Sequence, residues 1–359
     1  MMTTKSVRRL APYTPGEQPK TAGAVKLNTN ENPYPPSPAC AAALAGFDPA
    51  SLRKYPDPVF SAIRARVAMM WKTVPERVFV GNGSDEILTL AAKAFVEDDE
   101  AIGSLDPSYS LYKTLAAIRD VPFVPTPLDD DFAWNGRITE SATAADGRKG
   151  AAVSLFLLTN PNAPTGAFAP VAKIAAAAKK FKGVVLVDEA YADFATENCV
   201  QLATSAGCRN VVVMRTLSKS FSLAGLRVGY CIGPKPLIEA LYKVKDSYNV
   251  DAIAQAVALA ALGDLKWMRS NVAKVRRTRQ RLSETLTRRG WDVVPSESNF
   301  LFARPAYRPA KELFQELRER GIFVRYFPGA RTGDRLRITV GTDNETDALL
   351  AALAELDTP

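Results

Sequence analysis

The segment Val211-Val212-Val213-Met214-Arg215-Thr216-Leu217-Ser218-Lys219 joins an apolar run to a single lysine. Its β-branched beginning predicts a buried strand. Lys219 then lies just past the carboxyl end of that strand, where open α/β sheets bind their ligands. Small and apolar neighbours remove part of the lysine's hydration, which favours the neutral amine that attacks carbonyl carbons. Ser218 and Arg227 supply the hydroxyl and the planar charged donors that a phosphate requires. The segment therefore indicates an α/β fold in which a lysine binds a phosphorylated aldehyde.

A second apolar run ends in an acid. Gly183-Val184-Val185-Leu186-Val187 is apolar throughout, as in strands covered on both faces, and Asp188 and Tyr191 follow it. A buried carboxylate is costly unless it meets a cation, and the protonated ring nitrogen of pyridoxal phosphate (PLP) is such a cation. Taken singly, Asp188 could be a metal ligand or a helix cap, and Lys219 a surface lysine before a helix. Together the two strand ends favour a PLP site, with Tyr191 near the 3-oxygen of the ring.

Three weaker motifs have the same order of strand and loop. The strand predicted at 77–81 runs into Gly81-Asn82-Gly83-Ser84-Asp85-Glu86 and a helix, whose first N–H groups can bind an anion. A strand at 101–105 leads to Tyr109, which could stack on a flat ring or simply pack. The run 153–158 leads to the turn Asn160-Pro161-Asn162-Ala163-Pro164-Thr165-Gly166, where an asparagine amide can bond a phenolate oxygen. None of the three is specific by itself.

The order of these motifs resembles that of the fold-type I PLP enzymes. Among these, the chain is similar to the class-II aminotransferases and most closely to the histidinol-phosphate aminotransferase family. The similarity covers nearly the whole chain and includes segments 10–16, 27–33, 53–58, 321–325 and 336–341. The resemblance implies PLP-dependent transamination of L-histidinol phosphate with 2-oxoglutarate in L-histidine biosynthesis. The products would be imidazole acetol phosphate and L-glutamate.

The resemblance also implies a set of cofactor contacts. Lys219 would bind the aldehyde and then move a proton between substrate and cofactor. The ring would be held by Asp188 at its nitrogen, Tyr191 at its 3-oxygen and Tyr109 by stacking. The cofactor phosphate would be held by Ser84, Asp85, Ser218 and Arg227. Tyr55 would reach the phosphate in the neighbouring subunit, so the resemblance implies a homodimer with shared active sites.

Substrate contacts follow in the same way. Arg337 would bind the carboxylate of glutamate, Arg325 the substrate phosphate, and Tyr13 and Asn30 would help enclose the substrate. One position departs from the family pattern, which usually has two asparagines before Pro-Thr-Gly, the second bonding the ring oxygen. Here the second is Ala163. Since neighbouring residues in an extended chain point in opposite directions, Asn162 does not simply replace it, but it remains a candidate cofactor contact.

The pattern of elements predicts the domain organisation. Alternating strands and helices indicate a mostly parallel central sheet with helices on both faces. At 359 residues and 47% hydrophobic, the chain can bury a large core. We expect an amino-terminal arm at 1–47 that joins the small domain and a large PLP-binding domain at 48–250. A small α+β domain at 251–359 would hold a helix at 252–262, a longer charged helix, and strands near 299–303 and 335–340.

Composition removes several classes of function. The chain has no histidine, which excludes histidine metal sites, Ser-His triads and imidazole acid–base chemistry. Its four cysteines lack metal spacing and indicate reduced thiols in the cytoplasm. We expect no membrane span and no secretory segment. The net charge of +8 suggests nucleic acid, but the basic run 274–281 has no interleaved aromatics and favours a solvated helix face.

Alternative activities remain open because fold alone does not determine function. An aromatic amino acid aminotransferase would share the cofactor site, although Arg325 argues against it unless an ion pair occupies that arginine. A PLP lyase similar to threonine-phosphate decarboxylase would also share this site. A binding-only role, as in regulators that carry a DNA-binding module, is disfavoured because no helix-turn-helix segment precedes the arm.

Overall fold

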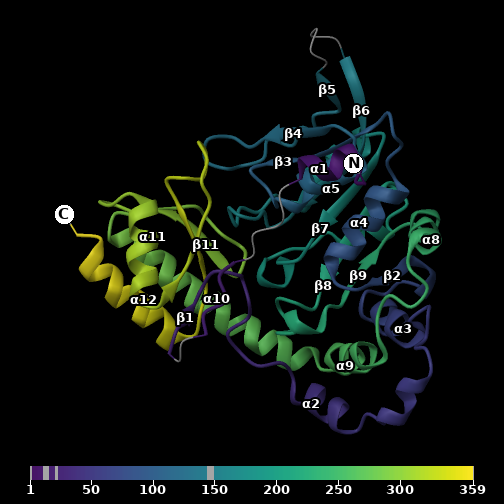
Figure 1. The fold of residues 1–359 in the computed structure, drawn as a ribbon, viewed down its shortest axis with the longest axis horizontal. Helices are drawn as coiled ribbons and strands as arrows, with labels where there is room; N and C mark the ends of the chain where they lie inside the picture. Colours follow the sequence, from purple (N-terminus) through teal and green to yellow (C-terminus); the bar gives the residue numbers. More distant parts are fainter. Residues whose placement is uncertain (1, 11–15, 21–22, 144–148, 359) are drawn as a thin grey trace.

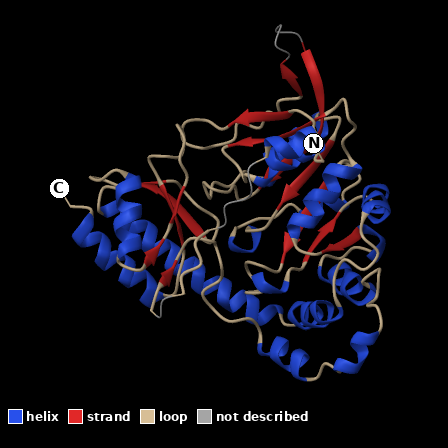
Figure 2. Ribbon diagram, in the orientation of Figure 1, coloured by secondary structure: helices blue, strands red, loops and turns tan. Residues whose placement is uncertain are grey.

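The computed structural model describes residues 2–10, 16–20, 23–143 and 149–358. Its largest sheet has the strand order β2-β9-β8-β7-β6-β3-β4, with β5 paired to β6. The strands are β2 (Val78–Gly81), β3 (Ala101–Asp106), β4 (Phe123–Pro127), β5 (Ser141–Thr143), β6 (Lys149–Thr159), β7 (Val184–Asp188), β8 (Val211–Thr216) and β9 (Gly229–Ile232). Strands β4, β3, β6, β7 and β8 pair in parallel, whereas β9 is antiparallel to both of its neighbours. This is the mostly parallel sheet that the apolar runs predict (Figures 1 and 2).

Helices cover both faces of this sheet, which explains the uninterrupted apolar strands. Leu186 of β7 packs with α4 (Ser84–Ala94), α5 (Leu111–Arg119) and α8 (Lys235–Val244). Val185 and Val187 point the other way and belong to the core with α3 (Ser61–Met70), α6 (Val171–Lys180), α7 (Val200–Thr204) and α9 (Ala252–Gly263). Full burial of each such side chain contributes about 1.5–3 kcal/mol, so the sheet is a rigid base for the loops at its edge.

The carboxyl-terminal part forms a smaller α+β body. An antiparallel sheet has the order β10-β11-β14-β13, from β10 (Asp292–Val293), β11 (Phe300–Arg304), β13 (Arg325–Tyr326) and β14 (Leu336–Thr339). It packs with α11 (Ala310–Glu319), α12 (Asp343–Leu356) and the end of α10 (Leu265–Arg288). The first half of α10 packs in the core of the large sheet, so this helix belongs to both bodies.

The amino-terminal segment contacts both bodies. Strand β1 (Val25–Lys26) pairs in parallel with β12 (Ile322–Phe323) of the smaller body. Further along, α2 (Pro38–Ala45) packs against α9 of the larger one, and α1 (Lys5–Arg9) lies against α5. Between these contacts it meets the loops after β7 and β8, where Asn30 bonds Tyr191 and the Thr29 carbonyl accepts from Lys219.

Three further expectations can be compared with the structure. Cys40, Cys199, Cys208 and Cys231 are buried and free. Within the described part of the chain, no helix is both long and apolar enough to cross a bilayer. The expectation of a solvated basic face on α10 is wrong at Arg279, which is half-buried and donates to the Ser298 carbonyl at 2.7 Å and the Phe194 carbonyl at 3.3 Å. This arginine bonds the two bodies to each other.

Candidate active site

Lys219 lies in an irregular turn directly after β8. Its Nζ donates to the carbonyl oxygen of Thr29, in the amino-terminal segment, at 3.2 Å. Burial lowers the pKa of Lys219 to about 8, and the charge of nearby Arg337 acts in the same direction. A substantial fraction of this amine is therefore neutral near pH 8, as nucleophilic attack on a carbonyl requires.

Asp188, the last residue of β7, is buried beside this lysine. Its carboxylate accepts hydrogen bonds from the Tyr112 hydroxyl at 2.7 Å and the Ala190 N–H at 3.0 Å. Burial raises the pKa of Asp188 to about 6, although both hydrogen bonds oppose the rise. Since these donors are neutral, the carboxylate would gain from a cationic partner. The sequence reasoning missed Tyr112, whose hydroxyl also bonds Thr159 at 2.5 Å.

The start of α4 faces Ser218 and Arg227. No side chain caps this helix at its Gly83 N-cap, so its first turn is available to an anion. Arg227 has a left-handed backbone (φ 57°) and donates to Ser218 Oγ at 3.4 Å. Its guanidinium also pairs with the Asp85 carboxylate at 3.5 Å. Backbone N–H groups, a hydroxyl and a guanidinium thus converge as a phosphate site requires.

Tyr191 and Tyr109 border the space between these groups. The Tyr191 hydroxyl accepts a hydrogen bond from Asn30 Nδ2 at 2.9 Å, and burial raises the pKa of this phenol. The phenol can therefore direct its own proton into the pocket. Tyr109 packs edge-on against Tyr112 at 5.6 Å between ring centroids, and its hydroxyl reaches Asp85 at 3.5 Å.

Two arginines of the smaller body lie on the opposite side of the pocket. Arg325 of β13 and Arg337 of β14 are directly opposite each other in the antiparallel register, so their side chains share one face. Arg337 donates to the Asn28 carbonyl at 2.8 Å and lies 5.1 Å from the ring centroid of Phe327, which Arg325 also contacts at 5.5 Å. Like charges so placed repel each other, and an anionic ligand would offset that repulsion.

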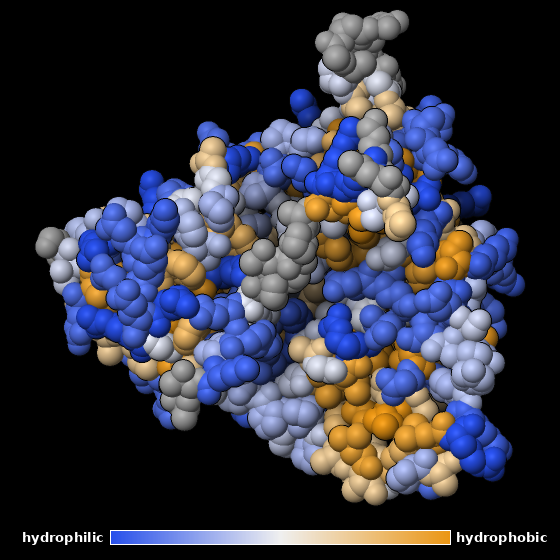
Figure 3. Space-filling view, in the orientation of Figure 1, coloured by the Kyte–Doolittle hydropathy of each residue, from blue (hydrophilic) through white to orange (hydrophobic). Residues whose placement is uncertain are grey.

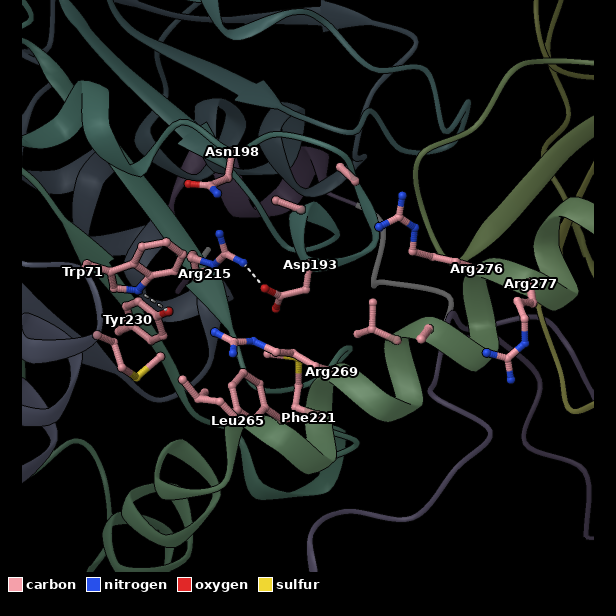
Figure 4. A pocket seen from close by; sticks show the side chains of 16 residues that line it. Trp71, Asp193, Asn198, Arg215, Phe221, Tyr230, Leu265, Arg269, Arg276 and Arg277 are labelled. Atoms are coloured by element: carbon pink, nitrogen blue, oxygen red, sulfur yellow. Dashed lines mark hydrogen bonds and ion pairs between the residues drawn. The ribbon is translucent and has the colours of Figure 1, made fainter.

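Most of these groups line one cavity of about 430 Å³, with Tyr112 buried behind Asp188. The predicted residues on its wall are Asn30, Ser84, Asp85, Tyr109, Asp188, Tyr191, Ser218, Lys219, Arg227, Arg325 and Arg337. Another cavity, of about 550 Å³, lies behind the lysine turn and is lined by Trp71, Asp193 and Arg215 among others (Figure 4).

Two predicted residues, Asn162 and Tyr55, are not on the wall of the cavity. Asn162 is buried in its own turn, where its amide donates to the Pro107 carbonyl and accepts from the Thr165 hydroxyl. Its neighbour Ala163 faces the cavity instead, so the structure does not support the expected contact of Asn162 with a cofactor. Tyr55 is 78% exposed and stacks on Tyr248, with 4.3 Å between centroids. Tyr13 lies outside the described residues.

The residues present fit PLP. A buried amine with a lowered pKa suits its aldehyde, and a buried acid with neutral partners suits its ring nitrogen. The phosphate end is shaped by glycines. A Cβ on Gly83 would lie 2.7 Å from an Arg227 nitrogen, and one on Gly229 would lie 2.8 Å from the Ser84 nitrogen. Only glycine lets these donors approach one another so closely.

Comparison with known proteins gives a consistent result. The family described as aminotransferase class I and II matches residues 22–353. Histidinol-phosphate aminotransferase 1 of Burkholderia pseudomallei (strain K96243) is 45% identical over 357 residues, covering 98% of this chain and 97% of that protein. The histidinol-phosphate aminotransferase of Acetobacter pasteurianus is 43% identical over 354 residues, covering 98% and 96%. The crystal structure of histidinol-phosphate aminotransferase from Sinorhizobium meliloti in complex with PLP has a TM-score of 0.86 at 26% identity and covers 99% of this chain and 97% of that one.

Proposed function

Since the chain belongs to the class I and II aminotransferases and, within them, to the histidinol-phosphate aminotransferase family, we propose that it transfers the amino group of L-histidinol phosphate to 2-oxoglutarate. The products are imidazole acetol phosphate and L-glutamate, in a step of L-histidine biosynthesis. The enzyme is an aminotransferase whose cofactor is PLP. Bound PLP supplies an electron sink for the charge left on the substrate carbon when a proton is removed.

The observation that carries this proposal is the pair Arg325 and Arg337 across the cavity from Lys219. Both substrates are anionic: histidinol phosphate carries a phosphate, and 2-oxoglutarate, like its product glutamate, carries two carboxylates. We assign Arg325 to the substrate phosphate and Arg337 to the carboxylate of glutamate, because a guanidinium matches both groups in a planar, bidentate manner. Asn30, held by Thr339 and Tyr191, completes the wall near the substrate.

The remaining assignments concern the cofactor side. Lys219 would hold the aldehyde of the cofactor, and its free amine would serve as the base for the proton on the substrate carbon, since its lowered pKa leaves a neutral amine near pH 8. Asp188 would hold the protonated ring nitrogen, with its carboxylate fixed by the hydrogen bond from Tyr112. Tyr191 would donate to the 3-oxygen, and Tyr109 would lie against the ring. Ser218, Arg227 and the backbone N–H groups of Ser84 and Asp85 hold the phosphate.

The test is a comparison of amino donors in wild type and Arg325→Gln. Wild type should prefer histidinol phosphate to phenylalanine and should release no carbon dioxide from threonine phosphate. Loss of the guanidinium should lower kcat/KM for histidinol phosphate about a hundredfold, with a much smaller effect on phenylalanine, which has no phosphate. Arg304→Gln, an exposed arginine of β11 paired with Asp292, is the matched control. A wild type that prefers phenylalanine, or that decarboxylates threonine phosphate, would sink the assignment.

A homodimer with shared active sites is part of the proposal. Figure 3 has an apolar patch over α2 and α9 at the lower right of the view. The exposed large apolar side chains near it in the chain are Leu44, Leu52, Tyr55 and Val59. Contiguous exposed apolar surface of this kind marks a protein interface, and a second copy of the chain is the partner we propose. Tyr55 would then reach the cofactor phosphate of the partner.

The division of the chain into an arm and two domains is also part of the proposal. We propose an arm at 1–47 joined to the small domain, a large PLP-binding domain at 48–250 and a small domain at 251–359. The pairing of β1 with β12 and the separate core of the carboxyl-terminal sheet support this division. A cytoplasmic location is also proposed, supported by four buried free cysteines.

A further inference from the structure

The backbone that carries Lys219 is an irregular turn and depends on outside groups for its shape. The Ser222 N–H donates to the Lys219 carbonyl at 3.3 Å, and Ser222 itself has a left-handed backbone with φ 61°. A serine in that region persists only where surrounding contacts fix it. Neither helix nor sheet supplies a donor to the next carbonyl, that of Ser220, so the donor must come from elsewhere.

That donor is Asn32, in the amino-terminal segment. Its Nδ2 lies 3.1 Å from the Lys219 carbonyl oxygen and 3.2 Å from the Ser220 carbonyl oxygen. Its Oδ1 accepts from the Tyr34 N–H at 3.1 Å. Because one end of the amide faces an N–H and the other faces two carbonyls, only one orientation satisfies all three contacts. The amide nitrogen of Asn32 thus donates to two successive carbonyls of the lysine turn.

The opposite side of the turn is held by a buried ionic network. Ser220 is 1% exposed, and its hydroxyl donates to the Asp193 carboxylate. Asp193 in turn pairs with Arg215, which also donates to Glu189 at 2.8 Å and lies 5.0 Å from the Trp71 ring centroid (Figure 4). The turn is therefore held on one side by the large body, through Ser220 and Asp193, and on the other side by the arm, through Asn32.

The arm also contacts the reactive end of the same lysine, through the Thr29 carbonyl at 3.2 Å from Nζ. Residues 29–34 thus touch both the backbone and the amine of Lys219. We propose that Asn32 is a positioning residue for Lys219: its amide fixes the Lys219–Ser220 backbone, so docking of the arm sets the direction in which the amine points. The inference rests on the proposed function only where activity is measured; the other two measurements do not depend on it.

The experiment compares Asn32→Ala and Asn32→Asp with Asn210→Ala. Asn210 is a matched control, since its Nδ2 likewise donates to several carbonyls, those of Ala178, Phe181 and Gly183, in the large body away from Lys219. Asn32→Asp keeps an acceptor for the Tyr34 N–H but places a carboxylate against two carbonyl oxygens. The measurements are the melting temperature of the cofactor-free chain, the pH midpoint of the absorbance of bound PLP, and kcat and KM for histidinol phosphate.

Both Asn32 variants should lower kcat about ten- to a hundredfold with little change in KM. They should also move the pH midpoint of the PLP absorbance by about half a pH unit or more, while Asn210→Ala changes melting temperature alone. Variants at position 32 that match wild type, or that match Asn210→Ala in every measurement, would overturn the inference. If Asn32→Ala does not fold, Asn32→Asp decides. A wild type inactive on histidinol phosphate would contradict the proposed function. The pH midpoint of the PLP absorbance would still test whether Asn32 positions Lys219.

Discussion

In the cavity, burial shifts the pKa of Lys219 down to about 8 and that of Asp188 up to about 6. Each shift moves its side chain toward the neutral form, since burial disfavours charge. A PLP molecule between them would use both effects: the neutral amine suits its aldehyde, and its ring nitrogen would offer a cation to Asp188, whose hydrogen-bond donors are neutral. Pairs of shifted groups in one cavity are typical of active sites.

The lowered pKa of Lys219 predicts that the stability of the cofactor-free chain depends on pH. Between pH 8 and 10.5, the unfolded chain keeps a proton on this lysine that the folded chain has released, so stability rises with pH through this window. We expect Lys219→Met, which removes the buried amine, to be more stable than wild type at pH 7, on the order of 2 kcal/mol.

The difference should shrink as pH approaches 10.5. Urea unfolding of both cofactor-free proteins at pH 7 and pH 10 measures it. If wild type and Lys219→Met were equally stable at pH 7 as well as at pH 10, Lys219 would not titrate with a lowered pKa.

At the scale of elements, the site is built where parallel strands end together. The carboxyl ends of β3, β6, β7 and β8 lie side by side in the sheet, and each is followed by a loop on the cavity wall. The start of α4 follows β2, the end strand of the sheet, which is separated from β8 by β9. Such an edge is where open α/β sheets bind ligands.

The turn before α4 predicts a loss of cofactor affinity in Gly83→Ala. The new Cβ would lie 2.7 Å from an Arg227 nitrogen on a backbone with φ +80°, so the guanidinium must leave its place at the phosphate site. We expect PLP to bind about tenfold more weakly, as measured by fluorescence titration.

Gly225→Ala is the matched control, because its Cβ would meet no atom within 4 Å. Unchanged PLP affinity in Gly83→Ala would place the cofactor phosphate elsewhere.

Asp188, at the end of β7, and Lys219, just past the end of β8, could be predicted from the sequence because apolar runs identify buried strands and the polar residues that follow them lie at the sheet edge. Contacts made through loop geometry could not. Asn162 and Ala163 are adjacent, and the conformation of the turn decides which one faces the cavity. Tyr112 and Asn32 meet Asp188 and Lys219 from segments 76 and 187 residues away in the chain, and no local pattern records such a contact.

At the scale of the molecule, the arm and α10 connect the two bodies on either side of the cavity. The smaller body contributes Arg325 and Arg337, and the larger one contributes Lys219 and Asp188. Tyr55 is exposed in the single chain, and its proposed role requires a second copy.

Mixing of two inactive variants tests that role. We expect Tyr55→Ala and Lys219→Ala to be weakly active or inactive alone, and their co-refolded mixture to regain about a quarter of wild-type activity. Half of randomly assembled dimers are mixed, and each mixed dimer holds one site with both residues intact. A mixture no more active than its components would mean that Tyr55 does not act across subunits.

The central claim is that this chain transaminates histidinol phosphate through PLP on Lys219, and a half-reaction tests it most directly. The purified PLP-loaded enzyme is mixed with L-histidinol phosphate without a keto acid, and the cofactor is recovered and identified by chromatography. Phenylalanine, threonine phosphate and the Lys219→Ala variant serve as comparisons. We predict that histidinol phosphate converts the cofactor of wild type, but not of Lys219→Ala, to pyridoxamine phosphate without release of carbon dioxide. PLP recovered unchanged from the wild-type reaction, or conversion by phenylalanine only, would contradict the account.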